Sequence, residues 1–260
     1  MNGADDGLLF EMGEARKKLE QIGKVILVGS GKGGVGKSFV ASGLALTLAG
    51  LGHRTGILDL DIHGASLPSY FGVSPPLTST EKGLKPKVKE DIEIMSVALF
   101  TGNRPVPIRG SEKRNLVNQI FALTNWGRLE YLVVDLPPTT GDEALSAFGL
   151  FGSKSALVLV TTPSPLAVSI VSRSRQLARG EGIPVLGVVI NMAYLKKGKT
   201  KSFPFGRPDR SSIEKQLNSK VLVEIPLDEG LSSKGLVRMM TGRNDFSAAF
   251  KQLAAYVASS

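Results

Sequence analysis

The stretch GSGKGGVGKS, residues 29–38, decides the fold of this 260-residue chain. A glycine, four residues and then Gly-Lys-Ser give the spacing of a loop that wraps a nucleotide phosphate. The glycines let backbone N–H groups turn inward around the anion, and the positive end of a following helix faces the same anion. The run before the loop (24–29) is typical of a buried strand, and the run after it (38–51) of a helix. This strand–loop–helix setting is the one that the motif requires.

The chemistry of the loop assigns roles to two of its side chains. Lys37 reaches the β- and γ-phosphates of the nucleotide, and the Ser38 hydroxyl is a ligand for Mg²⁺. We therefore expect ATP and Mg²⁺ as ligands of this chain. The residues expected to bind the nucleotide here are Gly31, Gly33, Gly34, Val35, Gly36, Lys37, Ser38 and Phe39.

Strands and helices alternate along the rest of the chain. Further strands are predicted at 55–60, 92–97, 131–136, 156–160, 185–190 and 221–225, and further helices at 112–125, 142–150, 165–179, 211–218 and 244–258. This alternation predicts a single-domain α/β fold, a mostly parallel, doubly wound sheet with helices on both faces. An N-terminal extension (1–23), expected to be helical, would precede the ATPase domain (24–260). The segments 73–91 and 194–210 are rich in Lys and Pro and are predicted to be irregular and exposed.

The composition excludes several kinds of chemistry. The chain has no cysteine, so it forms no disulfide, uses no thiolate nucleophile and holds no iron–sulfur cluster through its own thiolates. With only two histidines, a histidine-rich metal site is not expected. No apolar run has the length of a signal peptide or a membrane span, so a cytoplasmic location is predicted. The formal net charge of +9 favours an acidic partner.

Three aspartates stand at the C-terminal ends of predicted strands. Asp59 and Asp61 stand in GILDLDIHGAS (56–66), and Asp135 ends the apolar run of YLVVDLPPTTGD (131–142). Because the carboxyl ends of the strands form the functional edge of an α/β sheet, we expect these carboxylates near the loop. Asp135 suits the role of holding the water shell of Mg²⁺. For Asp59 and Asp61, capping of the next turn is the alternative to a role at the phosphates.

The segment KGGVGKS, with Lys32 just inside the loop, resembles the deviant phosphate loop of the MinD/ParA/Mrp superfamily of P-loop ATPases. The resemblance implies a MinD-like fold and a homodimer with ATP sandwiched at its interface, where Lys32 touches the nucleotide of the partner subunit. It also implies that Asp59 supports Mg²⁺ through water and that Asp61 orients the attacking water. The expected catalytic residues are Lys32, Lys37 and Asp61, and the expected metal-binding residues are Ser38, Asp59 and Asp135.

Two further segments narrow the resemblance to one branch of this superfamily. DIHGASLPSYFGV (61–73) and DLPPTTGDEAL (135–145) are similar to the Mrp/ApbC branch, whose members are iron–sulfur carrier proteins. The similarity covers residues from about 24 to 236. Two positions depart from the pattern of the branch, because Ala65 stands where it has proline and Thr139 where it has glycine.

The resemblance also suggests how the base of the nucleotide is held. Asn191 would read adenine, since an amide pairs a donor and an acceptor with the edge of the base. The loop Pro226-Leu227-Asp228 would be the second contact with the base. For Asn191, a turn residue in the left-handed conformation is the alternative.

One element of the branch is missing. Its Cys-x-x-Cys pair, two of which are thought to hold a bridging cluster in the dimer, is replaced here by Lys197 and Thr200. Neither side chain can replace a thiolate as an iron ligand, so we expect no self-ligated iron–sulfur cluster. Residues 196–210 instead carry six cations and one acid, which predicts a docking patch for an acidic partner or, alternatively, a solvated loop. The cations are Lys196, Lys197, Lys199, Lys201, Arg207 and Arg210.

These observations favour an Mrp-like ATPase, a dimeric switch that hydrolyses ATP slowly without its partner and acts on an unidentified protein client. A cysteine-bearing paralogue is one such client. The alternative is a ParA- or MinD-like positioning ATPase that binds nucleic acid through the basic patch. A membrane partner is not expected, because the C-terminal helix carries a single lysine and its apolar face suits packing on the body.

Overall fold

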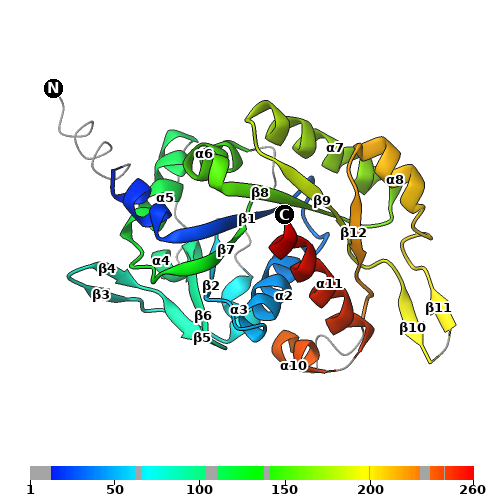
Figure 1. The fold of residues 1–260 in the computed structure, drawn as a ribbon, viewed down its shortest axis with the longest axis horizontal. Coiled ribbons are helices and arrows are strands. Elements are labelled where there is room, and N and C mark those ends of the chain that lie inside the picture. Colours follow the sequence, from blue (N-terminus) through cyan, green and yellow to red (C-terminus); the bar gives the residue numbers. More distant parts are fainter. Residues whose placement is uncertain are drawn as a thin grey trace.

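The structure is a computed structural model that describes residues 13–61, 66–102, 110–137, 141–198, 200–228, 235–242 and 244–260. An eight-stranded sheet runs through the molecule in the order β12-β9-β8-β1-β7-β2-β6-β5 (Figure 1). Neighbouring strands are parallel except at one edge, where β5 runs antiparallel to β6. The strands are β1 (Ile22–Ser30), β2 (Thr55–Asp59), β5 (Lys87–Lys89), β6 (Ile92–Ser96), β7 (Leu129–Asp135), β8 (Ser155–Thr161), β9 (Val185–Ile190) and β12 (Val221–Glu224).

The strand order reverses its direction at β1. After β1 the chain builds β2 and β6 on one side, returns to insert β7, and then places β8, β9 and β12 on the other side. Ligands of open α/β sheets bind beyond the carboxyl ends of the strands at such a reversal. The phosphate loop follows β1 directly, so the topology puts it where a ligand is expected.

Helices cover both faces of the sheet, which confirms the predicted doubly wound fold (Figure 1). One face carries α2 (Lys37–Gly50), α3 (Leu67–Phe71), α10 (Leu236–Thr241) and α11 (Asp245–Ser259). The other carries α5 (Gly110–Leu123), α6 (Asp142–Phe151), α7 (Pro165–Gly180) and α8 (Arg210–Leu217). Two short helical turns, α4 (Val97–Thr101) and η1 (Gly152–Lys154), connect larger elements.

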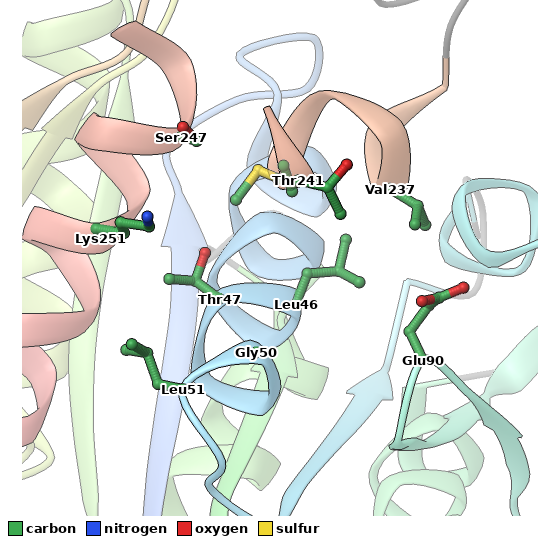
Figure 2. A pocket seen from close by; sticks show the side chains of 10 residues that line it. Leu46, Thr47, Gly50, Leu51, Glu90, Val237, Thr241, Ser247 and Lys251 are labelled. Atoms are coloured by element: carbon green, nitrogen blue, oxygen red, sulfur yellow. The ribbon is translucent and has the colours of Figure 1, made fainter. Parts of the chain in front are cut away.

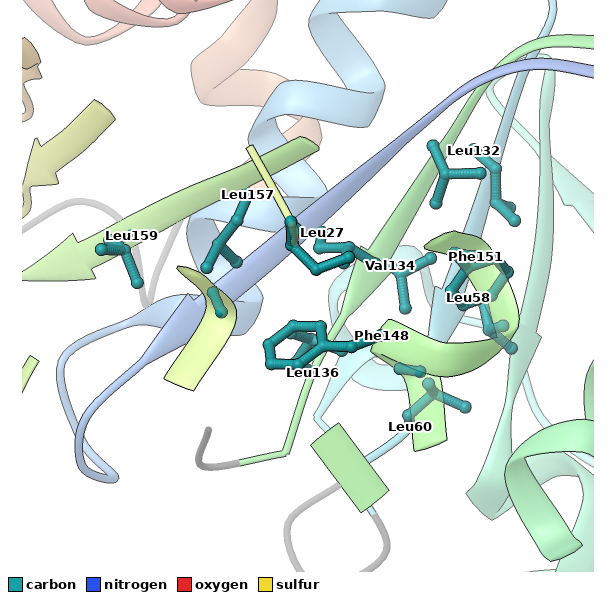
Figure 3. Close-up of a cluster of buried hydrophobic side chains, with 14 of the residues drawn as sticks. Leu27, Leu58, Leu60, Leu132, Val134, Leu136, Phe148, Phe151, Leu157 and Leu159 are labelled. Carbon is teal, nitrogen blue, oxygen red and sulfur yellow. The ribbon is translucent and has the colours of Figure 1, made fainter. Parts of the chain in front are cut away.

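Each face of the sheet has its own hydrophobic cluster. On the α6 side, Phe148 and Phe151 pack over Leu27 and Val134 of the central strands (Figure 3). On the other side, α11 lies against α2. The apolar face predicted for the C-terminal helix is buried here, which confirms that this helix packs on the body: its members are Phe246, Phe250, Leu253 and Val257. Within the described ranges, no helix is both long enough and apolar enough to cross a bilayer.

The two segments predicted to be irregular contain short strands. Residues 73–91 hold a hairpin of β3 (Thr78–Thr80) and β4 (Gly83–Lys85) together with the edge strand β5. Residues 194–210 hold a second hairpin, β10 (Leu195–Lys197) and β11 (Thr200–Ser202), in which Lys197 is paired with Thr200. Each of these strands is three residues long and most are largely exposed, so they lack the apolar pattern by which a strand is found in a sequence.

The N-terminal segment is attached to the sheet domain. Residues 13–20 are helical, as expected, and β1 begins at Ile22, two residues before the predicted strand. Ala15 is buried in the α6-side cluster, and Lys18 donates to the carbonyls of Ala122 and Thr124 at the end of α5. The division into an extension (1–23) and an ATPase domain (24–260) remains a prediction.

Candidate nucleotide-binding site

The phosphate loop connects β1 to α2 through backbone conformations that suit glycine. Gly34 and Gly36 have φ values of +78° and +82°, and Gly36 occupies the N-cap of α2. A Cβ atom at Gly36 would stand 2.2 Å from Nδ2 of Asn191. The loop therefore closes against a side chain that lies 155 residues further along the chain, and any side chain at position 36 would push the two apart.

Gly31 allows a second close approach, to α7. A Cβ atom there would lie 2.6 Å from the carbonyl carbon of Ile170 and 2.7 Å from the backbone nitrogen of Val171. We expect Gly31→Ala to destabilise the protein by about 1–3 kcal/mol, because backbone atoms cannot move aside as the end of a side chain can. Denaturant unfolding without nucleotide measures this. Gly33→Ala is the matched control, since nothing lies within 4 Å of that position, and equal losses in both variants would contradict the packing argument.

A cleft of about 330 Å³ opens over the loop. It brings together residues predicted from separate segments: Lys32, Lys37 and Ser38 from the loop side and Asp61 from beyond β2. Ser30, Ser66 and Tyr70 line it as well, and sequence reasoning did not assign them. The full lining is Ser30, Lys32, Gly33, Gly34, Val35, Gly36, Lys37, Ser38, Phe39, Asp61, Ser66 and Tyr70.

Two of the predicted aspartates lie side by side at the floor of this site. The register of β2 on β7 pairs Asp59 with Asp135, and both side chains are fully buried. Nζ of Lys37, which is only 8% exposed, lies 2.5 Å from Oδ1 of Asp135. A buried ammonium thus faces two buried carboxyls directly beneath the phosphate loop.

Asp59 is held by its neighbours. Its Oδ1 accepts the backbone N–H of Asp61 at 3.0 Å, and its Oδ2 accepts the hydroxyl of Ser96 at 3.1 Å. Asp59 therefore fixes the start of the segment that carries Asp61. Ser96 was not found from the sequence, because its link to the site depends on β6 lying beside β2. Its position at the end of a strand was the only available signal.

Asp135 offers an oxygen that fits a hydrated cation. Within the described ranges its Oδ2 is buried and accepts no hydrogen bond, which is unusual for a carboxylate. Burial raises the pKa of this carboxyl, and Lys37 and, to a smaller extent, the hydroxyl of Ser38 oppose the rise. The same ranges contain no cluster of three or more His, Cys, Asp or Glu side chains that could enclose a metal. This donor set suits Mg²⁺, which keeps several waters and takes few protein ligands beside the phosphates.

The acid pair is strained electrostatically. Burial, together with the negative charge of Asp135, raises the pKa of Asp59 to about 7. Burial also raises the pKa of Asp135, and the ammonium of Lys37 opposes that rise. The ammonium of Lys37 thus faces two buried acids, so a further cation at this site would be electrostatically favourable.

This strain predicts how stability depends on pH. Between the unfolded pKa of Asp59, near 4, and its folded pKa of about 7, the folded protein holds a proton that the unfolded chain lacks. The free energy of unfolding without nucleotide should therefore fall as pH rises from 5 to 7, with a contribution of at most about 1.4 kcal/mol per unit. Urea unfolding at pH 5, 6, 7 and 8 measures the slope. Asp59→Asn should flatten it, and an unchanged slope in that variant would count against the assignment.

The residues predicted to contact the base lie next to the loop. Nδ2 of Asn191 donates to the carbonyl of Val35 at 2.9 Å, so Asn191 braces the phosphate loop. The segments around Asn191 and Pro226 run together, and the N–H of Leu227 donates to the carbonyl of Tyr194 at 2.7 Å. Pro226 is buried, Leu227 is half-buried and Asp228 is exposed. That these residues read adenine remains a prediction.

Most cations of the predicted interaction patch contact other groups of this chain. Nζ of Lys196 lies 2.5 Å from Oδ2 of Asp245 at the start of α11. Lys201 stands 3.8 Å from the ring centre of Tyr194, and Arg207 stands 4.6 Å from that of Phe203.

Arg210, the sixth cation of the patch, lies on α8. It donates to the carbonyl of Val221 and lies 3.5 Å from Glu214. Four of the six cations therefore have partners within this chain. Lys199, like the departures at Ala65 and Thr139, lies outside the described residues.

A second hollow lies at the opposite end of α2 (Figure 2). It measures about 210 Å³ and lies between α2, α10 and α11, with Leu46, Val237 and Met240 among its lining. It has no glycine-rich loop and no buried acid, so its chemistry does not suit a phosphate. The cleft over residues 29–38 is the candidate nucleotide site.

Comparison with known proteins agrees with this geometry. A family model described as ParA, NUBPL iron-transfer P-loop NTPase, matches residues 21–258. The iron-sulfur cluster carrier protein of Saccharolobus solfataricus is 37% identical over 226 residues, which cover 84% of this chain and 76% of that protein. The chloroplastic Fe-S cluster assembly factor HCF101 of Arabidopsis thaliana is 38% identical over 84% of this chain. The matched region spans only 41% of that factor.

Solved structures show the same fold. A nucleotide-binding protein of Archaeoglobus fulgidus in complex with ADP matches with a TM-score of 0.75 and 30% identity, covering 92% of this chain and 96% of that one. The cell division ATPase MinD of Pyrococcus furiosus matches with a TM-score of 0.69 and 20% identity, over 91% and 99% of the two chains. The chain therefore has the MinD-like arrangement of a P-loop NTPase.

Proposed function

Because the chain belongs to the ParA family of NUBPL iron-transfer P-loop NTPases, we propose that it is an ATP-hydrolysing switch that acts on a protein client. ATP binds with Mg²⁺ in the cleft over residues 29–38, and its hydrolysis resets the switch. Turnover is slow without the client, because phosphoryl transfer depends on positioning that a partner can complete.

The observation that carries this proposal is the buried cluster of Lys37, Asp59 and Asp135. A structural ion pair would not need an unpartnered buried oxygen, whereas a Mg²⁺ water shell uses one. Lys37 supplies charge to the β- and γ-phosphates, and Ser38 and Asp135 hold the cation. Asp61, anchored through Asp59, stands in the same cleft and orients the attacking water.

ATP would join two copies of the chain. Lys32 is half-buried in the cleft, and its ammonium has no carboxylate partner among the residues that the structure describes. Its placement suits contact with a nucleotide in a facing subunit, where a cation would stabilise the charge that develops on the transferred phosphoryl group.

The client would provide the cysteine ligands for an iron–sulfur cluster that this chain lacks. Relatives of the chain are named as iron–sulfur cluster carriers, but this sequence has no thiolate to hold a cluster. The cluster, as cargo, would therefore be ligated by a cysteine-bearing partner. The hairpin of β10 and β11 is the proposed contact with that partner. It adjoins the loop expected to contact the base, through a bridge between Leu195 and Leu227. The nucleic-acid alternative has less support, since most cations of the patch have partners in the chain.

Two measurements test the proposal. Calorimetric titration should give binding of both ATP and ADP in the presence of Mg²⁺, and phosphate release should show slow turnover. Asp61→Ala should bind ATP and accumulate as a dimer in size-exclusion chromatography with light scattering. Glu81→Ala, which removes an exposed acid far from the cleft, should behave as the unmodified protein does. An Asp61→Ala variant that stays monomeric with ATP and still hydrolyses it would contradict the assigned role.

The cargo part is tested separately. Incubation with iron, sulfide and reductant should leave no cluster absorbance on the purified chain. Stable cluster binding by this chain alone would overturn the proposal that a partner supplies the ligands.

A further inference from the structure

Tyr70 occupies the nucleotide cleft without an assigned role. It lies on α3, which begins directly after the segment Asp61–Ser66, and it lines the same cleft as Lys37 and Ser38. Leu67 and Phe71 of α3 are buried in the core. The short helix is thus anchored by its apolar residues, and Tyr70 is the residue that it presents to the cleft.

The ring of Tyr70 is fixed by its neighbours. It packs edge-on against Phe39, the residue after the loop, with 6.3 Å between the ring centres. Phe39 in turn contacts Phe246 and Phe250 of α11, at 5.1 Å and 5.8 Å. A ring held in this way loses little conformational entropy when its hydroxyl forms a hydrogen bond to a ligand.

The hydroxyl of Tyr70 is a donor at neutral pH. Burial and then the negative charge of Asp135 raise the pKa of Tyr70 above its ordinary value. The position of the residue comes from the cleft itself, which Tyr70 lines together with Lys37, the side chain expected to meet the β- and γ-phosphates. A neutral phenol in this cleft can donate to phosphate oxygens, whereas a phenolate could not.

From this placement we infer that the hydroxyl of Tyr70 donates a hydrogen bond to the terminal phosphate of ATP and so favours ATP over ADP. This inference rests on the proposed function and adds a specificity residue to it. The bond would form on the side of the γ-phosphate facing α3.

Substitution of Tyr70 by phenylalanine isolates the hydroxyl, because the ring and its packing on Phe39 are kept. We expect Tyr70→Phe to weaken ATP binding about tenfold, the scale of one hydrogen bond to a charged group, while the affinity for ADP changes by less than about twofold. We also expect kcat to fall. Calorimetry with Mg·ATP and Mg·ADP, together with steady-state phosphate release, gives the ratio of affinities and separates kcat from KM.

Tyr131→Phe is the matched control. Tyr131 lies near the opposite end of β7, where its ring packs on His53, and it does not line the cleft. Tyr70→Ala adds a second comparison, because it also removes the ring. If Tyr70→Phe kept the ATP-to-ADP affinity ratio and kcat while Tyr70→Ala lost binding of both nucleotides, the residue would serve packing alone and the inference would be wrong.

The failure of this inference can be told from a failure of the proposed function. An unmodified protein that binds neither nucleotide would overturn both. Binding and hydrolysis by the unmodified protein that persist unchanged in Tyr70→Phe would overturn only the role of Tyr70.

Discussion

Replacing Lys37 by alanine is expected to abolish measurable ATP binding, with a loss of affinity of at least about 100-fold. In the proposed site, Lys37 would supply the buried positive charge at the phosphates, and the loop backbone alone would provide only partial charges. Retained ATP affinity in the variant would show that the phosphates do not lie over residues 29–38. Calorimetric titration with Mg·ATP measures this directly.

The same substitution should also lower stability, and the two effects must be separated. Lys37 is the ion-pair partner of the buried Asp135, and removing one partner of a buried pair typically costs about 3–5 kcal/mol. The raised pKa of Asp135 means that part of this cost is avoided by taking up a proton. Lys18→Ala is a suitable control, since it removes a partly buried lysine that caps α5 far from the cleft. That variant should lose stability and keep its affinity for ATP.

Replacing Lys32 by alanine is expected to leave ATP affinity within a few-fold of the unmodified protein and to lower turnover by about 10²–10³-fold. This is the scale for losing one donor that stabilises the transition state. Lys32 has no carboxylate partner among the described residues, so its removal should cost little stability. Lys82→Ala, in the exposed turn between β3 and β4, controls for the loss of one positive charge. A parallel loss of affinity and turnover would indicate that Lys32 acts in binding and not in the chemical step.

Mixing two inactive variants tests whether Lys32 acts across the dimer. In a mixed dimer of Lys32→Ala and Asp61→Ala subunits, the Lys32→Ala subunit keeps its own Asp61 and receives Lys32 from its partner. One complete site is then restored, and phosphate release should exceed the sum of the two separate variants. No gain on mixing, although mixed dimers form, would place the action of Lys32 within its own subunit.

The sheet could be predicted from the sequence because its central strands are buried on both faces. Runs such as VILVG at 25–29 leave no polar face, and helices such as α7 carry an ordinary amphipathic pattern. The hairpins at 78–85 and 195–202 could not be predicted in this way. Their strands are short and largely exposed, and pairing within the hairpin, not an apolar face, defines them.

The residues of the candidate site also fall into two groups, those that could be predicted from the sequence and those that could not. The phosphate loop and the three aspartates could be found from local spacing and from strand ends. Ser96 and Tyr70 could not, because their place in the site depends on which strands are neighbours and on how α3 packs. The basic patch remains a prediction, and the fold adds information that its charge count lacks. A count of charges does not show that Asp245, distant in sequence, pairs with Lys196, or that the nearby rings of Tyr194 and Phe203 contact Lys201 and Arg207.

In the proposed site, the ion pair between Lys37 and Asp135 would make nucleotide entry an exchange of partners. The ammonium would move from the carboxylate to a phosphate, and a metal cation or a proton would then neutralise the buried carboxylate. The two arrivals are therefore thermodynamically linked, so that nucleotide raises the affinity for metal by the same factor as metal raises the affinity for nucleotide. If nucleotide and metal bind here as proposed, the site would bind Mg·nucleotide more tightly than nucleotide alone.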